Sequence, residues 1–274
     1  MTGDTKIEPW ILLTNDDSVD SPALPPLLAA LRFLAPVRTL VPAQEYSWSS
    51  KTLSRFARLR LDRAHHLGDG AHTIEGSPAD CANVGIHHLT SDKPGLVVSG
   101  VNIGENAGLA FLLSSGTVGA AIEASLAGVP AAAFSLKLTP EVYNAWRESR
   151  DPARMAPIWE RAAAIAQDIT RELLSGGLPE GARLISVNIP QQADLATPRV
   201  LTQVSETSYG SFFRQEKDGT LVHHYSGQRR TKANPVGDVD VLEGGSVSIT
   251  PMRLSLDTTP SPEDRSRFER PGSL

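Results

Sequence analysis

The sequence has one cysteine, no long block of lysine and arginine and no long hydrophobic run, and each of these shortages excludes a class of protein. The single cysteine, Cys81, cannot form an internal disulfide, which fits a reducing compartment such as the cytoplasm. The net charge of −5 and the lack of a long lysine and arginine block argue against binding to a nucleic-acid polymer. Residues 1–8 are polar and precede only a short apolar run, so we expect neither a secretion signal nor a membrane span.

The rest of the composition is that of a folded chain with a sizeable core. Hydrophobic residues make up 40% of the 274 residues, enough for one large domain with or without an appendage. Apolar runs of strand length alternate with helix-like stretches over about two thirds of the chain. This alternation is typical of an α/β fold, in which crossover helices connect the strands of a parallel sheet.

The expected elements follow from the spacing of apolar and turn-forming residues. Strands are predicted at residues 10–14, 37–41, 96–101, 130–136 and 183–189, with an inserted hairpin formed by residues 55–61 and 73–75. Helices are predicted at residues 22–33, 78–89, 117–127 and 153–174. After Pro190 the pattern changes to short alternating segments, among them residues 221–225 and 246–249, which predict β-hairpins. We therefore expect a core at 1–190, a hairpin region at 191–259, and at 260–274 a tail that is either disordered or docks on another subunit.

Two adjacent carboxylates follow the first predicted strand. The apolar run of residues 10–14 leads through Asn15 to Asp16 and Asp17, and ligands of open α/β sheets collect beyond such strand ends. Both carboxylates can reach one ion only if the chain turns between them, and the turn-prone residues 18–22 allow this. A polar turn that caps the next helix explains the same residues about equally well when they are taken alone.

Three further loops carry suitable chemistry. A serine-rich loop after the second predicted strand offers Ser47, and a glycine-containing loop after the third offers Asn102 and Asn106. The sequence Ser115-Gly116-Thr117 precedes a predicted helix, where free N–H groups and the helix dipole favour a phosphate. Each loop taken alone is explained as a turn or a cap. Together they favour a hard divalent cation, Mg²⁺ or Mn²⁺ rather than zinc, and metal-assisted phosphoryl chemistry.

These residues resemble the survival protein E (SurE) family of metal-dependent nucleotidases. The motifs that carry the resemblance are Asn15-Asp16-Asp17, Gly76-Ser77-Pro78-Ala79-Asp80-Cys81, Ser99-Gly100-Val101-Asn102 and Ser115-Gly116-Thr117-Val118, with weaker matches at residues 187–190 and 247–251. The resemblance implies a Rossmann-like, mostly parallel sheet with helices on both faces, and a C-terminal β-hairpin region that exchanges between subunits of a homodimer or homotetramer. It implies one divalent metal ion per subunit at Asp16, Asp17, Ser47 and Asn102. It also implies hydrolysis of nucleoside 5′- or 3′-monophosphates, and in some family members of polyphosphate.

For the reaction we expect direct attack on phosphorus by a water molecule that the metal ion activates. Asp16 and Asp17 would anchor the cation. The phosphate oxygens would be held by Asn15, by Asn106 and by Ser115-Gly116-Thr117. A phospho-aspartate intermediate is less favoured, because both aspartates are needed on the metal and the Asp-x-Asp spacing of the best-known aspartyl phosphatases is absent.

The sequence departs from the family pattern around the metal. Ser18 stands where a glycine is usual, Ser114 where a tyrosine is common and Glu105 where a proline is usual, and residues 44–50 lack the usual arginines and contain Trp48. An acidic Glu105 argues against polyphosphate, so a specialised non-nucleotide phosphate ester stays open as the substrate. A non-catalytic nucleotide-binding protein also stays open, although a retained carboxylate pair favours catalysis.

Other reactive side chains are predicted to have structural roles. Neighbouring side chains diverge on a strand or a helix, so His65-His66, His87-His88 and His223-His224 are expected at the surface or in packing. Cys81 is expected to be a small buried side chain and Asp238, which matches a family aspartate, a structural one. An acidic receiver domain is excluded because the later strand ends lack its acceptor aspartate and partner lysine.

Overall fold

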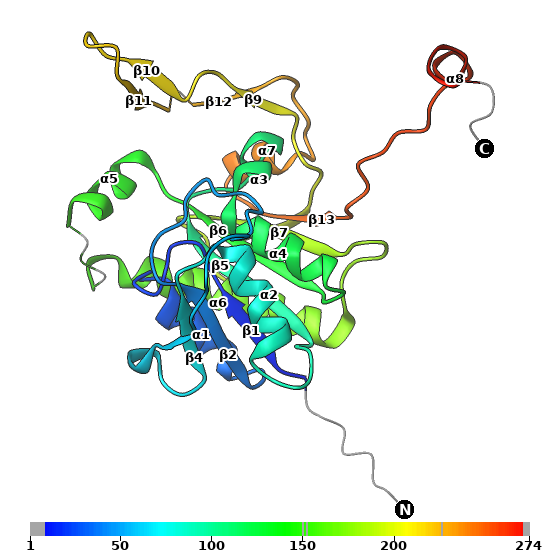
Figure 1. Cartoon of the computed structure of the whole chain (residues 1–274). Helices are drawn as coiled ribbons and strands as arrows, with labels where there is room; N and C mark the ends of the chain where they lie inside the picture. Colours follow the sequence, from blue (N-terminus) through cyan, green and yellow to red (C-terminus); the bar gives the residue numbers. More distant parts are fainter. Residues whose placement is uncertain (1–8, 150, 152, 226, 271–274) are drawn as a thin grey trace, which may run out of the picture.

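The computed structural model describes residues 9–149, 151, 153–225 and 227–270, so residues 1–8 and the last four residues of the predicted tail lie outside it (Figure 1). Within these ranges a nine-stranded, mostly parallel sheet forms the centre. In sheet order the strands are β3 (Asp62–Arg63), β4 (Ala71–Ile74), β2 (Val37–Pro42), β1 (Ile11–Thr14), β5 (Leu96–Ile103), β6 (Ala131–Lys137), β7 (Leu184–Pro190), β13 (Val247–Met252) and β8 (Arg199–Leu201).

Helices cover both faces of this sheet. They are α1 (Leu24–Arg32), α2 (Pro78–His88), α3 (Leu109–Ser114), α4 (Gly116–Leu126), α5 (Pro140–Ser149), α6 (Ala156–Gly176), α7 (Asp238–Glu243) and α8 (Pro262–Phe268), with 3₁₀ turns at His65–Leu67 and Ala153–Met155. Helix α1 packs with α6 on one face, and α2 packs with α4 on the other. The predicted α/β fold with helices on both faces is therefore confirmed.

Strand β1 lies in the middle of the sheet and is buried on both sides. Ile11 and Leu13 join the apolar cluster under α1 and α6, whereas Leu12 points to the opposite cluster under α2 and α4. The three side chains have no exposed surface, and burial of each stabilises the fold by roughly 1.5–3 kcal/mol. This packing fixes the point at which β1 ends, and therefore the position of the residues that follow it.

The structure corrects two of the expected elements. Residues 55–61 form no strand; the inserted hairpin is β3 with β4, and β4 also pairs with β2 at the edge of the main sheet. Residues 246–249 were predicted as a hairpin, but β13 pairs antiparallel with β7 and parallel with β8 in the main sheet. A short apolar segment shows strand propensity but carries no local signal of its pairing partner, which explains both errors.

The expected hairpins do occur between β8 and α7. Strand β9 (Thr207–Tyr209) pairs with β12 (Gln228–Arg230), and β10 (Phe213–Gln215) pairs with β11 (Leu221–His223). These pairs extend away from the main sheet, and α8 lies at the end of an extended C-terminal segment (Figure 1). Among the described helices, none combines the length and hydrophobicity that a bilayer span requires.

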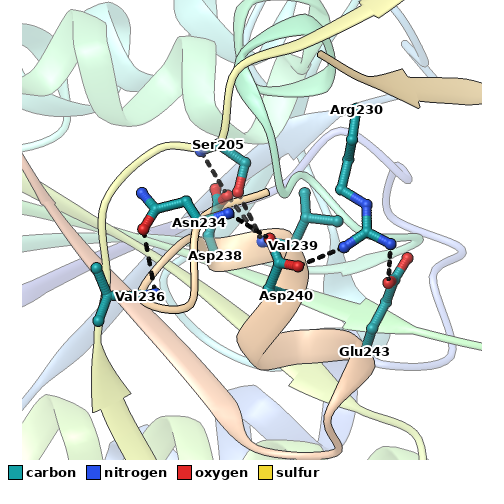
Figure 2. Close-up of polar contacts among 8 residues, drawn as sticks. All are labelled: Ser205, Arg230, Asn234, Val236, Asp238, Val239, Asp240 and Glu243. Carbon is teal, nitrogen blue, oxygen red and sulfur yellow. Dashed lines mark hydrogen bonds and ion pairs between the residues drawn. The ribbon is translucent and has the colours of Figure 1, made fainter. Parts of the chain in front are cut away.

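Asp238 joins three segments beneath these hairpins. Its carboxylate accepts hydrogen bonds from the backbone N–H groups of Gly108, Ser205 and Val239, each at 2.9 Å, and its side chain is buried. Figure 2 shows Asp238 turned toward Ser205, while Asp240 of the same helix points to Arg230. The start of α3, the entry to β9 and helix α7 are thus held by one carboxylate, in keeping with the predicted structural role.

We predict that Asp238→Ala lowers the free energy of unfolding by about 2–4 kcal/mol, because buried N–H groups lose their acceptor. Urea unfolding followed by circular dichroism measures this change. Asp240→Ala is the matched control, since it breaks a solvent-accessible ion pair with Arg230 and should cost at most about 1 kcal/mol. Equal effects of the two substitutions would contradict this role of Asp238.

Candidate functional site

The candidate site begins where β1 ends, at the carboxyl edge of the sheet. Thr14 pairs with Ser99 of β5, and the chain turns immediately afterwards. The Asn15 side-chain amide donates to the carbonyl oxygen of Ser18 at 2.8 Å, and Ser18 has a left-handed φ of 74°. A glycine adopts this conformation more easily than a serine, so the turn is held by its surroundings. It supplies the change of direction that two adjacent carboxylates need.

Asp16 and Asp17 are held by two different elements. One Asp16 oxygen accepts a hydrogen bond from the Thr117 hydroxyl of α4, and one Asp17 oxygen accepts from the Ile103 backbone N–H of β5 at 2.8 Å. Burial raises the pKa of Asp16 to about 6, although the hydroxyl and backbone N–H of Thr117 lower it. Burial, together with the charge of Asp16, raises the pKa of Asp17 well above its usual range. A nearby cation would offset both effects.

Asn102 lies at an irregularity of β5. The pairing of β5 with β6 shifts register between Ser99 and Asn102, and a side chain at Gly100 would overlap the backbone of Phe134. The side-chain amide of Asn102 donates to the carbonyl oxygen of Gly104 at 2.7 Å. Because the nitrogen is used in this bond, the Asn102 side-chain oxygen is the atom that remains for a cation.

Ser47 lies on the exposed loop that follows β2. Its hydroxyl donates to a Glu45 oxygen at 2.8 Å, and Glu45 forms an ion pair with Arg147 of α5 at 3.2 Å. Ser47 and Asp17 line the same cavity, of about 300 Å³, between this loop and α5. Asp16 and Asn102 are not part of its wall, although Ile103, next to Asn102, is.

The end of α3 and helix α4 anchor the other end of this loop. The Ser50 backbone N–H donates to the Ser114 carbonyl oxygen at 3.0 Å, and Lys51 forms an ion pair with Glu123 of α4 at 2.6 Å. A Cβ at Gly119 would overlap the Ser50 backbone, and one at Gly116 would lie 2.8 Å from the Ser49 hydroxyl and 3.0 Å from Asp16. Glycine at both positions therefore allows the loop to approach α4 and Asp16 closely.

The loop also contacts the hairpin region through Trp48, whose φ is 59°. The Trp48 ring lies 5.4 Å from Phe111 of α3, 5.0 Å from Phe212 and 5.9 Å from Tyr225, measured between ring centroids. Edge-to-face and tilted contacts at these separations are favourable. Trp48, the residue next to the ligand candidate Ser47, thus packs against the hairpin region.

The predicted phosphate-binding residues have contacts within the chain. The Ser115 hydroxyl caps α4 by accepting from the Val118 N–H at 3.1 Å, and Thr117 is bound to Asp16. The Asn106 side chain donates to the Ser135 hydroxyl at 2.7 Å. Asn15 stabilises its own turn, with its side-chain oxygen buried and without a protein partner. Phosphate binding by these residues and by Gly116 stays a prediction.

The donor set at this edge fits a divalent cation of the hard type. Within the described residues no three histidine, cysteine, aspartate or glutamate side chains form a metal-binding group, and the predicted set contains only two of these. Its other two members supply a hydroxyl and an amide oxygen, which Mg²⁺ and Mn²⁺ also accept as ligands. The assignment of Asp16, Asp17, Ser47 and Asn102 as ligands remains a prediction.

Several neighbours of the site were not found from the sequence. Glu45 lies on the loop that carries Ser47, and its position two residues before Ser47 was the one feature of the sequence that could have indicated its contact with the site. Tyr143 and Arg147 lie on α5, which was not predicted. Their spacing of four residues, which places two side chains on one face of a helix, could have indicated that they act together.

Glu105 and Cys81 have defined surroundings in the structure. Glu105 forms an ion pair with Lys137 at 3.6 Å, and burial raises the pKa of its carboxyl group. This pairing weakens the argument that Glu105 repels anionic substrates. Cys81 is buried in α2 as a free thiol whose pKa burial raises well above its usual range, which agrees with the predicted packing role.

We predict that Gly119→Ala lowers affinity for Mn²⁺ by about tenfold or more, because the added methyl group displaces the Ser50 backbone and the loop that carries Ser47. Isothermal titration with Mn²⁺ measures the effect. Gly176→Ala is the control, since nothing lies within 4 Å of a Cβ at this helical position. Unchanged affinity in Gly119→Ala would show that the docked loop does not contribute to the metal site.

The chain is similar to proteins of one known family. A family model described as Survival protein SurE matches residues 11–211. The 5′-nucleotidase SurE of Methanocella arvoryzae is 34% identical over 250 residues, covering 90% of this chain and 92% of the relative. The 5′-nucleotidase SurE of Methanoregula boonei is 32% identical over 264 residues, covering 96% and 99%.

A solved structure shows the same arrangement of elements. The crystal structure of the SurE protein from Aquifex aeolicus superposes with a TM-score of 0.73 at 28% identity, covering 91% of this chain and 95% of that one. The family model and the relatives span most of the chain, including the carboxylate pair and the helix start that contacts it. This chain therefore belongs to the survival protein SurE family.

Proposed function

We propose that this chain is a metal-dependent phosphoric monoester hydrolase that releases phosphate from nucleoside 5′- or 3′-monophosphates. Membership of the SurE family supports this function, and the relatives described above are named 5′-nucleotidases. The observation that carries it is the pair Asp16 and Asp17 at the carboxyl end of β1, with each carboxylate oriented by a different element. Neither alternative, a specialised non-nucleotide phosphatase or a non-catalytic binding protein, is favoured by a separate observation.

The proposed metal is one Mg²⁺ or Mn²⁺ ion per subunit, held by Asp16, Asp17, Ser47 and Asn102. When bound, such an ion supplies Lewis acidity at a phosphoryl oxygen and lowers the pKa of a water molecule. The chain contributes orientation, because Thr117 and the Ile103 N–H fix the two carboxylates and the Gly104 carbonyl fixes the Asn102 amide.

The substrate phosphate is proposed to lie between this metal site and the start of α4. The dipole of this 11-residue helix favours negative charge at its N-terminal end, beside Ser115, Gly116 and Thr117. Asn106, held by Ser135, and Asn15, whose side-chain amide has a second N–H donor besides the one bound to Ser18, are the remaining proposed contacts of the phosphate.

The assembly and location are also proposals. The hairpin region at 191–259 and the tail at 260–274 are proposed to mediate a homodimer or homotetramer, because α8 has no buried residue and Leu256 and Phe268 are exposed in the single chain. The buried free thiol of Cys81 suits a reducing compartment, for which we propose the cytoplasm.

Phosphate release from a substrate panel tests the proposed function. The panel contains nucleoside 5′- and 3′-monophosphates, sugar phosphates and short polyphosphate, each assayed with EDTA and with added Mg²⁺ or Mn²⁺. We expect metal-dependent release from nucleoside monophosphates. Release from only a non-nucleotide ester would replace the nucleotidase by a specialised phosphatase, and no release from protein that binds metal would favour the binding-protein alternative.

We predict that Asp17→Asn abolishes metal-dependent turnover and leaves the fold intact, because the amide loses the charge that holds the cation. EDTA should lower the melting temperature of the wild type more than that of the variant, since bound metal stabilises only a chain that binds it. Asp69→Asn, at an exposed position that does not line this cavity, should change neither quantity. Turnover by Asp17→Asn at the wild-type rate would refute its role as a ligand.

A further inference from the structure

Helix α5 forms one wall of a cavity that lies beside the candidate metal site. The cavity of about 300 Å³ is lined on one side by Asp17 and Ser47 and on the other by Tyr143, Trp146 and Arg147 of α5. Its volume is at the lower end of the range for small-molecule sites in proteins. A group bound there would lie next to the proposed position of the reacting phosphate.

Helix α5 is fixed in a defined orientation by one of these residues. Trp146 is buried and its ring lies edge-on to Trp159 of α6, with 5.8 Å between ring centroids. Tyr143 and Arg147 are four residues apart and therefore share a helix face, and the Tyr143 side chain is 39% exposed. Because Trp146 fixes the orientation of α5, the phenol ring of Tyr143 and the guanidinium group of Arg147 line the cavity.

The charges around this cavity indicate what it can accept. Arg147 forms an ion pair with Glu45 at 3.2 Å, and this glutamate also accepts the Ser47 hydroxyl at 2.8 Å. Asp17 and Asp20 add two further carboxylates to the wall. With Asp17 holding the proposed cation and Glu45 paired with Arg147, the wall offers no free positive charge for additional phosphates, and Asp20 favours a neutral group over a further anion. A neutral group rich in hydrogen-bonding atoms and with a flat ring fits these walls best.

We propose that this cavity is the leaving-group subsite, that its ligand is the neutral nucleoside part of the substrate, and that Tyr143 and Arg147 of α5 determine this specificity. The inference rests on the proposed nucleotidase function and adds the residues that distinguish a nucleotide from a smaller phosphate ester. Tyr143 offers its ring face to the nucleobase, and Arg147 offers N–H donors to base or ribose oxygens. The ion pair with Glu45 links this subsite to the loop that carries Ser47.

The test compares kcat/KM for adenosine 5′-monophosphate with kcat/KM for methyl phosphate, which has the smallest carbon leaving group. We expect Tyr143→Ala and Arg147→Ala each to lower the ratio of these two values by about tenfold, mainly through KM for the nucleotide. Asn144→Ala and Glu148→Ala are matched controls, because these exposed neighbours on α5 do not line the cavity, and they should leave the ratio unchanged. An unchanged ratio in both test variants, or an equal loss with both substrates, would overturn the proposal.

Binding of adenosine to the metal-free protein provides a readout that needs no turnover. Ligand-observed NMR should show adenosine bound by the wild type and by the controls, and weakened about tenfold or more in Tyr143→Ala and Arg147→Ala. Equal binding by all of these proteins would contradict the subsite. If the wild type releases no phosphate from any nucleotide, the proposed nucleotidase function is wrong, whereas adenosine binding that these two substitutions weaken still supports the cavity as a nucleoside site.

Discussion

Two adjacent carboxylates at the end of a buried central strand are the constraint on which the rest of the site depends. Strand β1 is held on both faces by apolar side chains, so Asp16 and Asp17 have a fixed position. Asp16 is buried and Asp17 partly so, and two charged carboxylates this close are unfavourable without a compensating charge, since desolvation and the charge of Asp16 both raise the pKa of Asp17. The Thr117 hydroxyl and the Ile103 N–H offset part of this cost and set the direction of each carboxylate. A cation in this place is the simplest physical reason for such an arrangement.

The loop after β2 connects this pair to three other parts of the molecule. Glycine at 116 and 119 lets the loop lie against α4, the ion pair of Glu45 with Arg147 ties it to α5, and Trp48 packs against the hairpin region. Left-handed backbone angles at Trp48 and Ser50 show that these tertiary contacts determine the loop shape. Substitutions in α5 or in the hairpin region can therefore shift the position of Ser47 although none of the predicted metal ligands is replaced.

Much of the fold was predictable from the sequence, because buried strands and long amphipathic helices carry local signals. Strand β1 and helix α6 were expected within a few residues of their observed bounds. Helix α5 was missed since its one buried side chain, Trp146, is fixed by a contact with α6 rather than by local spacing. The pairing of β13 with β7 was also missed, because it is a contact between segments that lie far apart in the sequence. At the site, residue types predicted the ligand candidates, whereas the use of Thr117 by Asp16 depends on packing between α4 and β1 that no local pattern encodes.

The proposed function requires that Asp16, Asp17, Ser47 and Asn102 together bind one divalent cation. Anomalous scattering from crystals soaked in Mn²⁺, recorded at the manganese absorption edge, locates the bound ion relative to these side chains. We expect one strong anomalous peak per subunit at the carboxyl end of β1, within coordination distance of all four side chains. A peak elsewhere, or none in crystals of protein that binds Mn²⁺ in solution, would contradict this assignment.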